Sequence, residues 1–233
     1  KVYEIPETGK QARGKLINNL IKLSEDEKVS TIIKVRAHDE DNRELFFITK
    51  KGIVKKTEAR LFFHINKNGI RALTLKGEDE LTYVGLTSGT KKNEVFIATR
   101  AGFAIRFSEE DVRSMGRTAA GVKGINLRKD DFVVSAAIVN PETDLDKLSV
   151  LTITDEGYGK RTSLKEYKVQ TRGGKGIINL KVNDKTGKIV DVKIVDNETE
   201  IMLITSEGTL IRTKVDSISV IGRSTSGVRI MKV

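Results

Sequence analysis

A short motif returns four times along this chain and restricts the folds that the chain can adopt. Each copy consists of a Thr, two variable residues, a Gly, and a basic residue four positions after the Gly. The copies begin at Thr49, Thr99, Thr154 and Thr205. Their glycines, which are Gly52, Gly102, Gly157 and Gly208, lie 50, 55 and 51 residues apart. Such a period is typical of arrays of small β units, so the sequence predicts a repeat protein.

A second glycine follows each motif glycine after 17 or 19 residues, at Gly69, Gly121, Gly176 and Gly227. Apolar residues stand four and six positions after each of them, and this alternation predicts a strand. A looser copy of the same segment begins at Gly14. Its partner hairpin would precede Lys1, and the last repeat reaches Val233 as it enters its second strand pair. We therefore expect the chain to be a piece of a longer protein.

The third full copy illustrates the predicted repeat. Residues 148–154 are rich in β-branched and apolar residues, and the Gly of the following turn permits a positive φ, which predicts a two-residue hairpin turn. Two further strands are expected at 176–182 and 188–195. Four strands form a small sheet whose open face needs a neighbour, as in the blades of a propeller. The expected repeats are 1–43, 44–93, 94–147, 148–199 and 200–233, in one domain.

The composition points to a polyanionic partner. The 42 Lys and Arg outnumber the 32 Asp and Glu, the net charge is +10, and the excess is spread along the repeats. Cysteine is absent and the two histidines are isolated, which argues against disulfides and zinc sites. The longest apolar run, at 132–139, is too short to span a bilayer. We expect a soluble protein of a reducing compartment.

Acidic residues recur in the turn between the last two strands of each repeat, in SEDE, GEDE, RKDD and NDKTG. Carboxylates at matching positions could indicate metal or acid–base chemistry. Since no histidine or second acidic cluster joins them, the sequence favours solvated turns, and we assign them no catalytic role.

The basic residue of the motif has two possible roles. It recurs as Lys56, Arg106, Arg161 and Arg212, and a residue at one fixed place in every blade would form a band that DNA phosphates could follow. The alternative is an ion pair within the blade, because Asp111, Glu166 and Asp216 follow four or five residues later. The sequence leaves both interpretations open.

The loops before the second glycine are the better candidates for phosphate binding. A basic residue stands four positions before that glycine, at Lys10, Arg117, Arg172 and Arg223. Small residues beside it would let a backbone N–H approach a phosphate, while Arg adds bidentate contacts. Arg13, Lys123, Gln170 and Lys175 in the same segments complete the candidate set. Ordinary Gly-rich turns with a solvated Arg are the alternative. Aromatic residues are few, which favours duplex backbone binding over stacking on single strands.

Several strings resemble those of the C-terminal domain of the bacterial DNA gyrase A protein. They are KVYEIPETGKQARG, TSGTKKNEVFIATRAGFAIRF, MGRTAAGVKGINLR, DEGYGKRTSLKEY and GRSTSGVRI, and together they cover nearly the whole chain. The resemblance implies an all-β pinwheel, a propeller-like disc of four-stranded blades that exchange strands, with about five blades represented and the first and last incomplete. It also implies that duplex DNA wraps around the basic rim.

The resemblance places the chain in a type II topoisomerase that uses ATP to introduce negative supercoils. The implied protein partners are the gyrase B protein plus a second gyrase A protein, and the nucleic-acid partner is double-stranded DNA, in the bacterial cytoplasm at the nucleoid. ATP and Mg²⁺ would serve the full enzyme, with no cofactor and no catalytic residue in this chain. The four tyrosines, Tyr3, Tyr83, Tyr158 and Tyr167, are accordingly not expected to be nucleophiles, and no GxxxxGK[ST] loop is present.

One string departs from the family pattern. The diagnostic gyrase box, a Gln followed by a basic Gly-rich run, would precede KVYEIPE, whereas the similar QTRGGKG lies at 170–176. We expect Gln170, Arg172 and Lys175 to form a DNA-contacting loop without being that box. The alternatives are the C-terminal domain of the topoisomerase IV A protein, which would bind DNA with less wrapping, and a protein-docking propeller. The latter would carry Trp-Asp or aromatic signatures, and this chain has no Trp.

Overall fold

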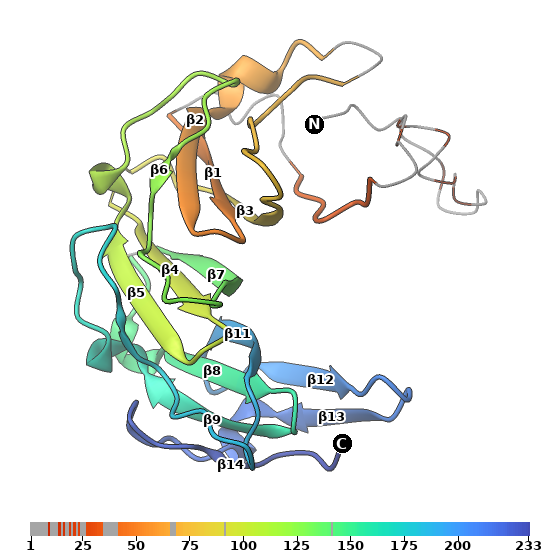
Figure 1. Cartoon of the computed structure of the whole chain (residues 1–233), viewed down its shortest axis with the longest axis vertical. Coiled ribbons are helices and arrows are strands. Elements are labelled where there is room, and N and C mark those ends of the chain that lie inside the picture. The colour runs from red at the N-terminus through yellow and green to blue at the C-terminus, as the bar shows by residue number, and fades with distance from the viewer. Residues whose placement is uncertain are drawn as a thin grey trace.

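The computed structural model is an arc of antiparallel β-sheets that follow one another along the chain (Figure 1). It describes residues 42–65, 69–90, 92–140 and 142–233, and before them residues 27–34 and positions 9, 14, 16, 19, 21 and 23. Each copy of the motif lies at the turn of a hairpin. The hairpins are β1 (Glu44–Thr49) with β2 (Ile53–Glu58), β4 (Glu94–Thr99) with β5 (Phe103–Ser108), β8 (Ser149–Thr154) with β9 (Tyr158–Ser163), and β12 (Glu200–Ile204) with β13 (Leu210–Lys214).

Neighbouring repeats exchange strands, which confirms the predicted pinwheel. The first strand of each of the first three hairpins pairs with a strand of its own repeat: β3 (Leu81–Leu86), β7 (Val133–Val139) or β11 (Ile189–Val195). The second strand pairs with a short strand of the next repeat: β6 (Val122–Lys123), β10 (Ile177–Ile178) or β14 (Val228–Arg229). The resulting orders are β3-β1-β2-β6, β10-β5-β4-β7 and β11-β8-β9-β14.

The hairpin turns have three residues, so the prediction of two-residue turns is wrong. In β8–β9 the N–H of Gly157 donates to the Thr154 carbonyl at 3.1 Å, and Gly157 has φ +71°. This is the geometry of a three-residue turn that ends in a left-handed residue. The hydroxyl of Thr154 accepts the N–H of Tyr158 at 3.1 Å. The Thr of the other copies makes the same bond, which explains why the motif contains a Thr.

The segments after the second glycine pair over only two residues, instead of the predicted seven-residue strands. Beyond these two residues the chain passes under the hairpin turn of the preceding repeat. There the backbone N–H of the apolar residue donates to the carbonyl of the motif glycine. The bonds are Ile125 to Gly52 at 3.3 Å, Leu180 to Gly102 at 3.2 Å and Met231 to Gly157 at 3.1 Å. The apolar residue four positions after the second glycine is therefore buried as a plug rather than as part of a ladder. The first copy, from Gly69, forms no strand in the described part of the chain.

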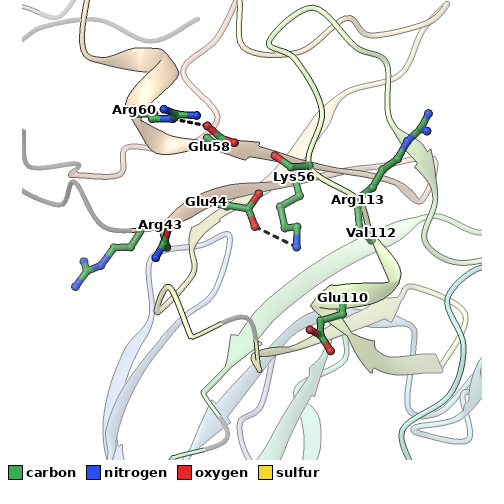
Figure 2. A pocket seen from close by; sticks show the side chains of 10 residues that line it. Arg43, Glu44, Lys56, Glu58, Arg60, Glu110, Val112 and Arg113 are labelled. Carbon is green, nitrogen blue, oxygen red and sulfur yellow. Dashed lines mark hydrogen bonds and ion pairs between the residues drawn. The ribbon is translucent and has the colours of Figure 1, made fainter.

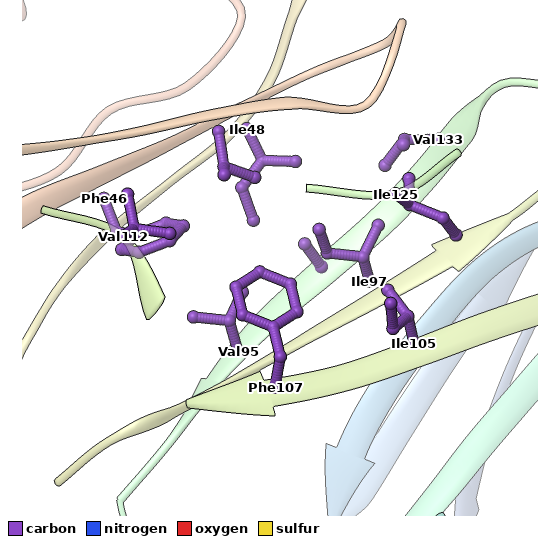
Figure 3. Packing of buried hydrophobic residues seen from close by; sticks show 11 residues of the cluster. Phe46, Ile48, Val95, Ile97, Ile105, Phe107, Val112, Ile125 and Val133 are labelled. Atoms are coloured by element: carbon purple, nitrogen blue, oxygen red, sulfur yellow. The ribbon is translucent and has the colours of Figure 1, made fainter. Parts of the chain in front are cut away.

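The core lies between successive sheets rather than within one sheet. Figure 3 shows Phe46 and Ile48 of the first sheet packed against Val95, Ile97 and Phe107 of the second. The next interface repeats this arrangement, with Phe96 of the second sheet in the same cluster as Val150 and Tyr167 of repeat 148–199. Each blade thus covers one face of its neighbour, and short 3-10 turns, namely η1 (Ala59–Phe62), η2 (Glu109–Asp111), η3 (Leu145–Lys147), η4 (Leu164–Glu166) and η5 (Val215–Ser217), link the elements.

Candidate nucleic-acid interface

The basic residue of the motif is buried in the first two hairpins, where it joins two strands and two repeats. Lys56 Nζ lies 3.1 Å from Glu44 Oε2 and donates to the Glu109 carbonyl of the next repeat at 3.2 Å. Arg106 repeats this geometry, since its Nε donates to Glu94 Oε2 at 2.6 Å. Its guanidinium also donates to two carbonyls of the next repeat, in η4 and directly after it.

Arg161 of the third hairpin is buried in the same way. Its Nε donates to the Ile218 carbonyl at 2.7 Å, its Nη2 to the Asp216 carbonyl at 3.1 Å, and its Nη1 to Asn197 Oδ1 at 2.6 Å. Ser149 occupies the position that Glu94 holds in the second hairpin. All three cations therefore connect repeats from inside the array.

Arg212 is the exception, because 68% of its side chain is exposed and its partner is Glu200 across the hairpin. For the motif cations the structure thus agrees better with ion pairs inside the array than with a band of exposed charges, but the acidic partners are not the residues that the sequence suggested. Asp111 and Glu166 do not pair with the motif cation, and Asp216 accepts through its backbone carbonyl. Because Lys56, Arg106 and Arg161 are buried, we do not place them in a DNA interface.

A polar cavity of about 500 Å³ opens beside Lys56 (Figure 2). The longer Arg106 reaches the carbonyl of Tyr167 at the end of η4, whereas Lys56 reaches only Glu109 of η2. We attribute the cavity to this shorter side chain. Val112, at the position equivalent to Tyr167, lines it together with Arg113.

Two of the three loop arginines in the described part of the chain clamp one repeat to the preceding one. Arg172 donates to the carbonyls of Asp111 at 2.8 Å and Lys123 at 3.0 Å. Arg223 donates to the Ile178 carbonyl at 2.9 Å, and its backbone N–H donates to Glu166 Oε2 at 3.2 Å. Their guanidinium groups are half-buried and already engaged.

Arg117 occupies the equivalent place in the loop of repeat 94–147 but is not clamped. The acidic residue at the end of η2 or η4 is replaced by Leu61 in η1. Within the described ranges, the Arg117 guanidinium has no hydrogen bond or ion pair. The three loops that the sequence treats as equivalent therefore differ in which arginine is available.

Strand exchange aligns these loops along one side of the array. Gly173 donates to the Gly124 carbonyl at 2.6 Å and Asn126 to the Gly174 carbonyl at 2.8 Å, so the third loop lies against the segment that follows the second. The backbone N–H of Lys181 donates to the Thr225 carbonyl at 3.0 Å, so the loop at 222–227 lies against the segment that follows loop 171–176 in the same way. The linking segments run along the left side of Figure 1.

Free or accessible cations follow this line, and we call them the loop strip. The strip consists of Arg117, Lys123, Arg128, Lys175 and Lys181. All except the half-buried Arg117 are exposed. Arg128 donates to the Lys175 carbonyl at 2.8 Å and lies 3.2 Å from the centre of the Phe103 ring. Sequence reasoning missed Arg128 and Lys181, since neither position is basic in every copy.

Three other predicted residues have different outcomes. Lys10 and Arg13 lie outside the described residues. Gln170 is half-buried, and its backbone N–H donates to the Arg106 carbonyl at 2.7 Å. Of the QTRGGKG string, Lys175 alone presents a free charged side chain at the surface, because Arg172 is engaged with the preceding repeat.

The acidic turns stabilise the hairpins. Asp79 Oδ1 accepts the N–H of Lys51, and Asp131 Oδ1 that of Ala101, each at 2.9 Å. These two carboxylates therefore hold hairpin turns instead of being merely solvated. In the described part of the chain, no three His, Cys, Asp or Glu residues are grouped so that they could hold a metal ion.

Buried tyrosines belong to the core. Tyr167 packs edge-on against Phe96 with ring centres 5.1 Å apart, and its hydroxyl donates to Asn179 at 2.5 Å. Burial raises the pKa of Tyr167, and it also raises the pKa of Tyr83. Over the ranges described, no helix has the length and apolar character needed to cross a membrane.

Comparison with known proteins gives consistent results. The family model described as DNA gyrase C-terminal domain, beta-propeller, matches residues 1–36, 43–88, 93–140, 149–196 and 199–233. The DNA gyrase A protein of Lawsonia intracellularis (strain PHE/MN1-00) is 44% identical over 232 residues, which are 100% of this chain and 28% of the relative. The chain thus spans about a quarter of the length of such relatives.

Two solved structures share the fold. The C-terminal domain of DNA topoisomerase IV superposes with a TM-score of 0.85 at 28% identity, covering 94% of this chain and 66% of that one. The DNA gyrase A C-terminal domain superposes with a TM-score of 0.81 at 25% identity, covering 96% of this chain and 72% of that one.

Proposed function

Since the chain belongs to the DNA gyrase C-terminal domain family, we propose that it binds duplex DNA along the loop strip and bends it. The observation that carries the proposal is the alignment of the loops by strand exchange. Each loop docks on the segment that follows the previous loop, so cations of successive repeats lie in one line. Bending a few tens of base pairs of duplex costs about 1 to 6 kcal/mol, and contacts distributed along the duplex can jointly offset this cost.

The binding would be mostly electrostatic and insensitive to sequence. The strip consists of Lys and Arg with few neighbouring aromatic residues, and such groups contact phosphates rather than base edges. Each neutralised phosphate contributes roughly −0.9 to the slope of log affinity against log salt. Five contacts would therefore give a steep dependence.

In the complete enzyme, the bent segment would support ATP-dependent negative supercoiling together with the gyrase B protein plus a second gyrase A protein. ATP, Mg²⁺ and the nucleophilic Tyr would be supplied by other parts of that assembly. A supercoiling assay on relaxed plasmid tests this role. It uses an enzyme in which the strip cations of the full-length gyrase A protein are replaced with Ala. Loss of supercoiling with retained DNA cleavage is expected, and unchanged supercoiling would contradict it.

The likeness to the topoisomerase IV domain favours a second candidate, in which the chain binds DNA with little bending. Both candidates use the strip, so affinity does not separate them. The two candidates are separated by energy transfer between dyes at the two ends of a short duplex, because bending brings the ends together. A clear rise in transfer on binding supports wrapping, and an unchanged value supports the second candidate.

The direct test replaces strip cations singly with Ala and measures affinity across salt concentrations. Arg117→Ala, Lys123→Ala and Lys175→Ala should each lower the salt slope by about 0.9 and weaken binding modestly. Arg172→Ala should chiefly lower stability, because its guanidinium holds two carbonyls of the preceding repeat.

Lys193→Ala is the matched control for this test. Lys193 is exposed on β11, at the sheet edge opposite the exchanged strand β14. Its removal should leave the salt slope unchanged. Equal slopes for Lys193→Ala and the three strip variants would reject the strip as the interface.

A further inference from the structure

Two lysines are buried beneath the Gly-rich loops at equivalent places. Lys55 and Lys160 stand three residues after the motif glycine, and neither side chain is exposed to solvent. Lys55 Nζ donates to the Arg117 carbonyl at 2.5 Å and to the Ala72 carbonyl at 2.6 Å. Lys160 Nζ donates to the carbonyls of Arg223 at 2.6 Å and Gly222 at 2.7 Å, and to a loop hydroxyl.

No carboxylate forms an ion pair with either ammonium among the described residues. The Lys55 ammonium faces the Phe47 ring at 5.5 Å and the backbone carbonyls of Ala72 and Arg117. Burial lowers the pKa of Lys160, and two nearby charges act on it in opposite directions, since Glu166 raises it and Arg223 lowers it. A buried charge without a counter-ion is costly, so its recurrence at two equivalent sites requires an explanation.

The fold itself does not need these lysines. The same position is Ile105 in the second hairpin and Ile211 in the last. The loop above Ile105 carries Lys175, whereas the loops above Lys55 and Lys160 have Ala120 and Ser226 at that place. Each of the three loops therefore has one lysine at this site, either in the loop itself, as Lys175, or buried beneath the loop, as Lys55 and Lys160.

The bonds to the lysines also orient the loop backbone. In a trans peptide the C=O and the N–H point in opposite directions. The carbonyls of Arg117 and Arg223 point inward to an ammonium, so the N–H groups of Thr118 and Ser224 point outward. Both residues are exposed, and within the described ranges neither N–H has a hydrogen-bond partner. A carbonyl bound to a cation also polarises the peptide and makes its N–H a stronger donor.

We propose that Lys55 and Lys160 are positioning residues of two phosphate sites, at loops 116–121 and 222–227. In each site an outward N–H binds a DNA phosphate oxygen, and the ammonium behind the loop fixes that N–H and supplies the charge. This inference rests on the proposed DNA binding and adds a specific pair of sites to it. In the loop over Ile105 the corresponding N–H, of Gly173, is instead bonded to the Gly124 carbonyl, and Lys175 contacts DNA directly.

Titration separates the charge of the lysines from their structural role. Burial lowers the pKa of Lys55 and of Lys160 from 10.5 to about 8 in each case. A neutral amine still has two N–H donors for two carbonyls, so raising the pH removes the charge while the loop bonds can persist.

The experiment measures duplex affinity at constant ionic strength between pH 7 and 9. For the unmodified chain we expect affinity to fall with a midpoint near pH 8, by roughly three- to fivefold for each lysine. The Lys55→Met/Lys160→Met double variant should bind DNA more weakly at pH 7. Its affinity should then lack the fall between pH 7 and 9 that deprotonation of the two lysines causes in the unmodified chain. Lys175→Met should also bind more weakly, but keep the pH dependence of the unmodified chain.

Only a fall in affinity that the double variant lacks counts in favour of the inference. Circular dichroism checks that the double variant folds. If it does not fold, the pH dependence of affinity is measured for the two single variants instead. If these also fail to fold, the pH dependence of the unmodified chain alone tests the inference. An affinity that is constant from pH 7 to 9, or equal falls with and without the lysines, would overturn the inference while leaving salt-dependent binding intact. Absence of DNA binding at every pH would instead reject the proposed function.

Discussion

The third hairpin, β8–β9, and the last hairpin, β12–β13, carry the same motif but have different surroundings. Strands β11 and β14 flank β8–β9, and Met231 lies under its turn. The sheet of β12–β13 has only these two strands in the described part of the chain. At equivalent positions, Leu151 is 2% exposed and Met202 is 66% exposed. The comparison teaches that the motif specifies a hairpin, whereas a later strand of the same repeat and a short strand of the next repeat complete a blade.

The two hairpins also show which motif residues act locally and which act between repeats. The hydroxyl of the motif Thr accepts the same N–H in both, so this bond needs no neighbour. Arg212 pairs with the cross-strand carboxylate of Glu200, where the third hairpin has Ser149, but it lacks the carbonyls of a following repeat that Arg161 binds. Its contribution to stability should therefore depend on the neighbour.

The largest expected difference is at the motif glycine. A Cβ at Gly157 would lie 2.2 Å from the Met231 carbonyl oxygen, whereas a Cβ at Gly208 would meet nothing within 4 Å. Both glycines have a positive φ, so both alanine variants are strained. We expect Gly157→Ala to cost about 4 kcal/mol and Gly208→Ala about 1 kcal/mol. Urea unfolding followed by circular dichroism measures both, and equal costs would show that backbone contact with the next repeat is unimportant.

The second difference concerns the motif arginine. Arg161→Met should cost about 3 kcal/mol, because it leaves the Ile218 and Asp216 carbonyls and Asn197 without their donor inside the array. Arg212→Met should change stability by less than about 0.5 kcal/mol, because an exposed ion pair contributes little. The same unfolding assay applies. A large loss from Arg212→Met would mean that its pairing with Glu200 is not screened by solvent.

Much of this fold could be predicted from the sequence. The spacing of the motif glycines indicates the repeat, and β-branched runs before them indicate the hairpins. The extent of the strands could not be predicted, because Ile125 and Leu180 alternate like strand residues but are buried as plugs beneath a turn 73 and 78 residues before them, at Gly52 and Gly102. Local periodicity reports burial and does not show which surface buries a residue.

The candidate site was less predictable. Repetition of a basic residue signals that the position matters without showing whether the side chain faces solvent or a neighbouring repeat. Arg106 and Arg172 are both repeated, yet one is buried and the other clamps a backbone. Conversely, Arg128 and Lys181 become candidates only because strand exchange brings them beside the next loop. These contacts depend on the assembled array, which no single repeat encodes.

The smallest expected difference follows from Lys160, whose counterpart in the last hairpin is Ile211. Because burial lowers the pKa of Lys160 to about 8 from 10.5, the unfolded chain binds more protons than the folded chain between these values. Stability should therefore rise as the pH increases from about 8 towards 10.5, and fall as the pH decreases through 8. The gain between pH 7.5 and 9.5 should be on the order of 1 kcal/mol. Work below pH 9.5 avoids the titration of Tyr83 and Tyr167, whose raised pKa values act in the opposite direction.

Urea unfolding at pH 7.5, 8.5 and 9.5 measures this gain, and Lys160→Met is the matched variant. Lys55 titrates in both proteins, so the variant should keep part of the gain and lose the part that belongs to Lys160. Over the same pH range we expect DNA affinity of the unmodified chain to fall, so that stability and affinity change in opposite directions. A structural lysine without a role in binding would raise stability with pH and leave affinity constant. If Lys160→Met instead retains the whole gain, the ammonium is not desolvated, and the blade with a buried lysine is electrostatically no different from the last hairpin with Ile211.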